Sequence, residues 1–77
     1  MRLIYIRHML VRGKMQWGTY GKSGKDPLTW VYLYNLTDEH IQAILDTQHH
    51  IQKSTRRLFK RELRLRKRYP EYSIKES

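Results

Sequence analysis

The sequence predicts an α+β fold in which a three-stranded antiparallel meander carries two helices packed on one of its faces, in the order β-β-β-α-α. Two observations lead to this prediction. Residues 2–35 are rich in β-favouring side chains that alternate along the chain, whereas residues 36–69 show the 3.6-residue period of helices. A chain of 77 residues has room for one small core. We therefore expect a single domain over residues 1–70, followed by a polar, frayed tail over residues 71–77.

Three segments have the composition of strands. Residues 2–12 are rich in Ile, Tyr and Val, with apolar side chains on both faces, and Gly13 marks a tight reversal. A second strand is expected over residues 14–20 and a third over residues 28–35, on either side of the glycine-rich loop 21–27. Consecutive strands joined by short loops usually pair with each other, and this favours the antiparallel meander.

Two helices are expected after the strands. Thr37 is a suitable N-cap for the first helix, which carries an apolar stripe. A break is expected at residues 52–54, where Ser54 is available to cap the second helix. That helix spans residues 53–69 and is ended by Pro70.

The helix over residues 53–69 has one apolar and one basic face. Its apolar side chains fall in an arc of roughly 160°, which also contains Glu62, the only carboxylate of the segment. Glu62 can pair with Arg66 one turn later. Eight cations occupy about 140° on the other side, along roughly 25 Å: Lys53, Arg56, Arg57, Lys60, Arg61, Arg64, Lys67 and Arg68. Like charges at helical spacing are destabilising, so we expect this face to contact an acidic partner outside the fold.

The overall charge agrees with an acidic partner. Sixteen Lys and Arg side chains against seven Asp and Glu give a formal net charge of +9, which favours nucleic acid, an acidic protein surface or an anionic membrane. The chain has no cysteine, which excludes disulfides and a cysteine-based zinc site. No apolar stretch is long enough for a membrane-spanning helix, and the first residues are too polar for a signal peptide. We therefore expect a cytoplasmic protein.

An aromatic set lies on the third predicted strand, where Trp30, Tyr32 and Tyr34 alternate with Val31 and Leu33. If Val31 and Leu33 face the helices, the aromatic set faces outward and could stack on bases or anchor a protein partner. With the opposite orientation it belongs to the core, and the sequence leaves both orientations open. In the outward case it would lie beside two further aromatic side chains, Trp17 and Tyr5.

The glycine-rich loop does not make a nucleotide-hydrolysing site. Residues 21–23 resemble the end of a P-loop, but Gln16 stands where its first glycine is expected, and the loop leads into a strand. Lys22 and Lys25 are retained as candidates for secondary phosphate contacts.

The remaining polar residues predict neither metal binding nor catalysis. His49 and His50 are adjacent and point about 100° apart on a helix, so they cannot chelate one ion. No nucleophile–base arrangement is visible. We expect a binding protein without cofactor or metal, not an enzyme.

The central part of the chain resembles a family of small uncharacterised proteins from phage genomes. The resemblance covers roughly residues 7–51 and rests on three groups of residues. They are Trp17-Gly18-Thr19 with Gly21-Lys22-Ser23-Gly24-Lys25, Pro27-Leu28 with Trp30-Val31, and His40 with Ile44-Leu45, Thr47-Gln48 and His50-Ile51. The resemblance implies a phage origin and action in the host cytoplasm. The family has no assigned activity, so no functional residue is transferred.

The leading hypothesis is a small basic accessory protein that contacts nucleic-acid phosphates through its C-terminal basic helix. The sequence does not distinguish DNA from RNA. The alternative is an inhibitor or host-takeover protein that binds an acidic surface of a host or defence protein. A third possibility is binding to a membrane surface through the same amphipathic helix.

Overall fold

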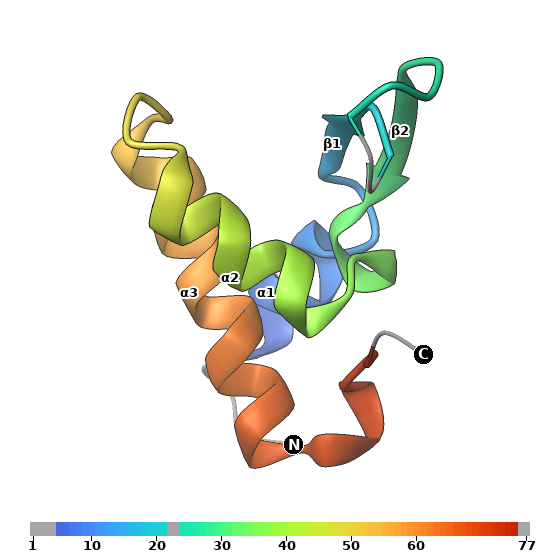
Figure 1. Cartoon of the computed structure of the whole chain (residues 1–77). Helices are drawn as coiled ribbons and strands as arrows, with labels where there is room; N and C mark the ends of the chain where they lie inside the picture. Colours follow the sequence, from blue (N-terminus) through green and yellow to red (C-terminus); the bar gives the residue numbers. More distant parts are fainter. Residues whose placement is uncertain (1–4, 22–23, 76–77) are drawn as a thin grey trace.

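The computed structural model describes residues 5–21 and 24–75, which form three α-helices and one two-stranded antiparallel sheet (Figure 1). The predicted α+β class is therefore confirmed, but the three-stranded meander is not. In chain order the elements are α1 (Ile6–Val11), β1 (Gln16–Thr19), β2 (Thr29–Tyr32), α2 (Asp38–Thr47) and α3 (Lys53–Arg68), with 3-10 turns η2 (Leu33–Asn35) and η3 (Pro70–Tyr72). Within the described ranges no helix combines the length and apolar character that a membrane span requires.

The predicted first strand is wrong, because residues 6–11 form helix α1. The reason lies elsewhere in the chain. His8 and Arg12 both bind the carboxylate of Glu62 on α3. Residues four apart are separated by about 6 Å along a helix but by about 13 Å along a strand, so both side chains reach one carboxylate only from a helix. This tertiary contact outweighs the weak β-propensity of the segment.

The β-hairpin has the predicted order, but its strands are shorter than expected. Trp17 of β1 pairs with Val31 of β2, and Gly18 pairs with Trp30. Beyond Tyr32 the chain leaves the sheet and enters η2. In Figure 1 the hairpin and the α2–α3 pair diverge as two arms from the centre of the molecule, so the helices do not cover a whole sheet face.

The two predicted helices are present. Thr37 caps α2 as predicted, since its Oγ1 accepts a hydrogen bond from the backbone N–H of His40 at 3.1 Å. α3 ends at Arg68, before Pro70, also as predicted. Its N-cap is Gln52, whose side chain makes no capping hydrogen bond, so Ser54 lies inside the first turn and the expectation that it caps the helix is wrong.

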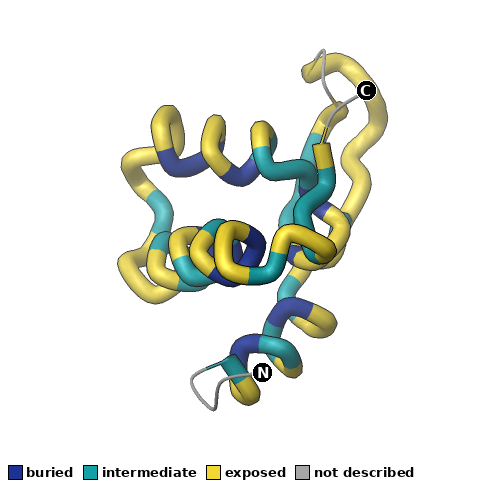
Figure 2. Tube along the Cα trace, turned by 90° about the horizontal axis from the view of Figure 1, so that it is seen from below, coloured by how far each residue is buried: buried dark blue, intermediate teal, exposed yellow. Residues whose placement is uncertain are grey.

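The core lies between α2, α3 and η2, and not beneath the sheet. Its buried members are Leu33, Leu36, Ile41, Ile44, Leu45 and Phe59. From the hairpin, Trp17 and Val31 pack against the edge of this cluster. In Figure 2 the helices carry their buried residues on the sides turned toward each other and their exposed residues on the outer sides.

The core positions differ in the stability that they should contribute. Ile44 is buried and Leu63 is half-buried. We expect Ile44→Ala to lower the free energy of unfolding by about 2–5 kcal/mol, because it leaves a cavity, and Leu63→Ala by only about 1–2 kcal/mol. Urea denaturation measures both values. Equal losses would mean that α3 packs more deeply at Leu63 than the structure indicates.

The segment after α3 was expected to be frayed, but up to Lys75 it packs on the fold. It turns back to the start of α2, where the backbone N–H of Asp38 donates to the carbonyl oxygen of Ile74 at 2.8 Å. The Asp38 carboxylate in turn accepts hydrogen bonds from the Ser73 hydroxyl and the Ile74 N–H, and lies 2.8 Å from Lys75 Nζ. Residues 73–75 therefore belong to the folded unit, and Asp38 holds them.

Candidate nucleic-acid interface

The basic face of α3, defined as the eight cations predicted from the sequence, is only partly free. Six of its side chains are exposed: Lys53, Arg57, Lys60, Arg64, Lys67 and Arg68. Arg56 and Arg61 are half-buried. The apolar arc packs inward, where Phe59 and Leu65 are fully buried. The arrangement keeps cations outward along the 16 residues of the helix.

Arg56 has a structural role that the sequence did not reveal. Its guanidinium donates to the carbonyl oxygens of Leu45 and Gln48, each at 3.2 Å. These carbonyls lie at the C-terminal end of α2, where helical hydrogen bonds run out and the helix dipole favours a cation. Arg56 thus joins the end of α2 to the start of α3 and has fewer donors left for a ligand.

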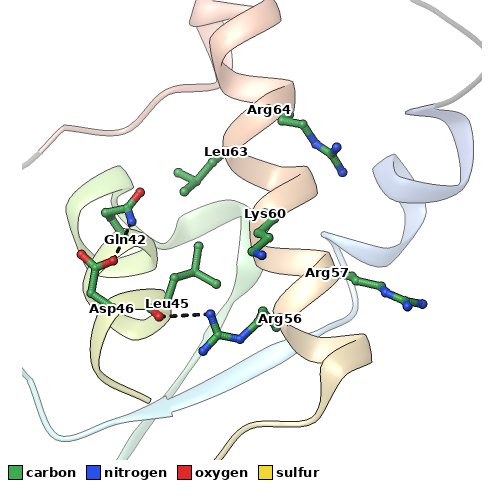
Figure 3. Close-up of a pocket in the computed structure, with 8 residues that line it drawn as sticks. All are labelled: Gln42, Leu45, Asp46, Arg56, Arg57, Lys60, Leu63 and Arg64. Atoms are coloured by element: carbon green, nitrogen blue, oxygen red, sulfur yellow. Dashed lines mark hydrogen bonds between the residues drawn. The ribbon is translucent and has the colours of Figure 1, made fainter. Parts of the chain in front are cut away.

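A depression of about 490 Å³ lies between α2 and α3 along this face (Figure 3). Arg56 turns toward α2, whereas Arg57 and Arg64 extend on the opposite side of α3, and Lys60 lies between them. The α2 wall includes Asp46, whose carboxylate accepts a hydrogen bond from Gln42 Nε2 at 3.0 Å. A polyanion could therefore contact Arg57, Lys60 and Arg64 from outside, with one carboxylate at the α2 rim.

The only carboxylate of α3 points into the protein, where it is the centre of a buried ionic cluster. Glu62 is 0% exposed. Its carboxylate accepts from Arg12 Nη2 at 2.7 Å and Arg12 Nε at 2.9 Å, from Arg66 Nε at 2.7 Å, and from His8 Nε2 at 2.9 Å. An ionised carboxylate is an acceptor only, so His8 Nε2 is the donor of this hydrogen bond. The predicted Glu62–Arg66 pair is confirmed, and α1 is joined to α3 through the same group.

Arg66 extends the cluster to the rest of the fold. Its Nη1 donates to the carbonyl oxygen of Leu36 at 2.7 Å and to Asp38 Oδ1 at 2.6 Å, and its Nη2 donates to the carbonyl oxygen of Leu33 at 3.2 Å. The charges of Arg12 and Arg66 are balanced by those of Glu62 and Asp38. Because these charges are neutralised inside the fold, the ionic cluster leaves the outward charge of α3 unchanged.

The cluster lowers the pKa of both carboxyl groups. Burial alone would raise the pKa of Glu62, but hydrogen bonds from His8, Arg12 and Arg66 outweigh it and lower the pKa from 4.5 to about 2. Burial would likewise raise the pKa of Asp38, yet its partners Lys75, Ser73 and Arg66 hold it well below its usual range. Both groups are therefore ionised at neutral pH.

The aromatic side chains of β2 and η2 face outward, while Val31 and Leu33 pack into or against the core. Trp30 is 62% exposed, Tyr32 38% and Tyr34 39%. The rings of Tyr32 and Tyr34 stack with centroids 5.8 Å apart. The Arg12 guanidinium lies 6.0 Å from the centroid of the Tyr34 ring, so Tyr34 also covers the ionic cluster.

The two further aromatic side chains expected beside this set lie elsewhere. Trp17 packs edge-on against Phe59, with ring centroids 5.2 Å apart, on the core side of the hairpin. Tyr5 precedes α1 and packs edge-on against Tyr69 at 6.0 Å. Neither side chain extends the outward aromatic surface, because tertiary contacts with α3 hold both of them.

The secondary phosphate candidates belong to the hairpin loop. Lys25 is an exposed residue of this loop, and Lys22 lies outside the described residues. Gly21 has a positive φ of 80°, and a Cβ there would overlap Asp26, so the loop conformation depends on glycine at this position. In residues 5–21 and 24–75, no three His, Asp or Glu side chains gather to hold a metal ion.

Nine of the nineteen residues that carry the resemblance to phage proteins line one cavity. This cavity of about 580 Å³ between the hairpin and α2 is lined by Trp17, Gly18, Thr19, Gly21, Gly24, His40, Ile44, Thr47 and Gln48, with Tyr20 and Ala43. Its two threonine hydroxyl groups have partners within the fold: Thr47 Oγ1 donates to the carbonyl oxygen of Ala43, and Thr19 Oγ1 accepts from the N–H of Gly21. We assign no ligand to it. Comparison of the chain with protein families, with curated proteins and with solved structures found no match.

Proposed function

We propose that the protein binds nucleic acid through the basic face of α3. The observation that carries the proposal is the separation of charge on this helix. α3 contains nine of the sixteen cations of the chain and one of its seven carboxylates, and that carboxylate is buried and neutralised by Arg12 and Arg66. The outward side of α3 thus has six exposed cations and no acid.

Phosphate binding suits this arrangement better than intramolecular pairing. The exposed cations stand on a rigid 16-residue helix that is held by the core and by the ionic cluster. Because their positions are fixed before binding, little conformational freedom is lost by the backbone when phosphates dock. Neutralising phosphates with lysine and arginine releases condensed counterions, which supplies most of the affinity of basic surfaces for nucleic acid.

The salt dependence of binding tests this proposal. With about six phosphate contacts, the logarithm of the binding constant for duplex DNA should fall against the logarithm of the salt concentration with a slope near −5. Between about 50 and 200 mM salt this corresponds to a loss of roughly 1,000-fold in affinity. Fluorescence anisotropy of a labelled oligonucleotide measures it.

An acidic polypeptide serves as the matched control. Poly-glutamate presents negative charge without the spacing of a phosphate backbone, so we expect it to bind more weakly than DNA at equal charge. A flat salt response, or no binding of DNA at the lower salt concentration, would refute nucleic-acid binding. Tighter binding of poly-glutamate than of DNA would instead favour an acidic protein as the partner.

A further inference from the structure

The indole ring of Trp30 packs over Gly18 on the outer side of the hairpin. Trp30 pairs with Gly18 across the sheet, and its ring atoms Cζ3 and Cη2 lie 3.2 and 3.3 Å from the place that a Cβ of residue 18 would occupy. Leu28 Cδ1 approaches the same place at 3.2 Å. The glycine thus leaves room for the end of the indole ring, while 62% of the residue stays exposed. A large, restrained aromatic surface of this kind loses little side-chain entropy on binding.

The exposed indole borders a cavity that reaches α3. This cavity of about 520 Å³ is lined by Trp30, Leu28 and Tyr20 from the hairpin and by Thr55 from the first turn of α3. All three hairpin side chains are exposed large hydrophobic or aromatic groups. The cavity is shallow and open to solvent, so a nucleobase can approach the exposed face of the indole ring from outside.

Cations flank Thr55 in the sequence of α3. Lys53, Arg56 and Arg57 lie one or two residues from Thr55, within about 3 Å of it along the helix axis. At about 100° per residue, Lys53 and Arg57 project from the side of the helix opposite Thr55, and Arg56 lies between the two sides. The first turn contains no acidic residue. A strand whose base lies on Trp30 therefore passes around the start of α3 for its phosphates to reach the exposed Lys53 and Arg57.

We propose that the ligand of this protein is single-stranded nucleic acid, one base of which stacks on Trp30 while the adjoining phosphates contact the first turn of α3. The inference rests on the function proposed above and specifies its substrate class. In a duplex the base faces are covered by their neighbours, and exposing one costs a few kcal/mol of unstacking. In a single strand the base faces are available to aromatic side chains, and stacking tolerates any sequence. Trp30 therefore adds affinity only for unpaired strands.

Three oligonucleotides of equal length separate the two contributions. They are single-stranded oligo-dT, an abasic strand with the same phosphates, and a duplex, each titrated against the full chain at one salt concentration. We expect oligo-dT to bind about 5- to 100-fold more tightly than the abasic strand, the usual effect of one stacked base. Trp30→Ala should remove this difference and leave both the abasic affinity and its salt slope unchanged.

Leu28→Ala is the matched control, because Leu28 lines the same cavity without a π-face. It should keep most of the preference for oligo-dT over the abasic strand.

Tryptophan fluorescence of the unmodified protein offers a second readout. Of its two tryptophans Trp30 is exposed, whereas Trp17 is half-buried, packs against Phe59 and also lines the cavity. Bound oligo-dT should protect the exposed tryptophan from iodide quenching, and the abasic strand should not, a result that needs no variant to fold.

The outcomes distinguish this inference from the proposed function. Equal, salt-dependent binding of oligo-dT and the abasic strand would overturn the role of Trp30 and leave phosphate binding by α3 intact. A preference for oligo-dT that survives Trp30→Ala would overturn it as well. If none of the three oligonucleotides binds, both the proposed function and this inference are wrong.

Discussion

Replacing Glu62 with glutamine is expected to lower the free energy of unfolding by about 3–5 kcal/mol, the usual cost of removing one partner from a buried ion pair. Glutamine has nearly the same shape but lacks the charge. Its amide NH2 would also face the donors of His8, Arg12 and Arg66, which all point at the carboxylate. Arg66 would keep Asp38 as a counter-charge, whereas Arg12 would lose the carboxylate that it binds. A domain of this size is stabilised by roughly 4–12 kcal/mol in total, so the loss is severe.

Urea denaturation at neutral pH measures this effect. Glu71→Gln is the control, because it removes a carboxylate from an exposed position and should change the stability by less than about 0.5 kcal/mol. A loss below about 1 kcal/mol for Glu62→Gln would mean that the ionic cluster contributes little to stability and that α1 is held in place by other contacts.

The pH dependence of the free energy of unfolding, measured for the natural chain and for Glu62→Gln, tests whether the ionised carboxylate causes this loss of stability. Folding depresses the pKa of Glu62 from 4.5 to about 2, so its stabilising contribution is complete above about pH 4.5 and is lost as the pH falls toward 2. A shift of that size corresponds to roughly 3 kcal/mol at neutral pH. The natural chain should therefore lose its advantage over Glu62→Gln across this range. Asp38 titrates in both proteins, so the difference between them isolates Glu62.

The contrast between α1 and α2 indicates which parts of the fold could be predicted from the sequence. The start of α2 and the end of α3 are marked by local signals, the Thr37 cap and Pro70, which act within a few residues. α1 has no such signal. Its contacts with Glu62 join residues 54 and 50 positions apart, so the segment was predicted to be a strand from its composition. The sequence contains one indication of this contact: Glu62 is a lone carboxylate in an apolar arc, and a buried carboxylate requires hydrogen-bond donors from elsewhere in the chain.

The same distinction applies to the candidate site. The outward cations of α3 follow from helical periodicity, and six of the eight are exposed. Arg56 could not be assigned from sequence, because its partners are carbonyl oxygens of α2 whose position depends on how the two helices pack. The outward orientation of Trp30 also required the structure, since alternation along a strand does not reveal which side faces the core.

Replacing Arg57, Lys60 and Arg64 together with glutamine is expected to lower the affinity for DNA by about 500-fold at 0.1 M salt. Each phosphate contact contributes about 0.9 to the salt slope, which at that concentration equals a factor of about eight in the binding constant. Loss of three contacts out of six should also change the slope from about −5 to about −3. Anisotropy titrations at several salt concentrations give both values.

Two control variants show whether binding depends on the location of the cations on α3 or only on the net charge of the protein. Exchanging the three side chains for the other cation (Arg57→Lys, Lys60→Arg and Arg64→Lys) keeps the charge and should keep the slope. Neutralising three exposed cations outside α3 removes the same net charge and should cost no more than roughly tenfold, the share of one contact: Arg7, Lys14 and Lys25. Equal losses in both neutralised triple variants would show that binding follows net charge alone, and α3 would then not be the interface.

Neutralising Arg57, Lys60 and Arg64 should leave the stability of the fold intact. Arg57, Lys60 and Arg64 are exposed, and relieving repulsion between like charges on one helix is worth a few tenths of a kcal/mol per pair. The thermal midpoint should therefore stay the same or rise slightly while the affinity collapses. A residue set that weakens binding without weakening the fold is the pattern expected of an interface. A falling midpoint would instead assign these cations to the structure of the domain.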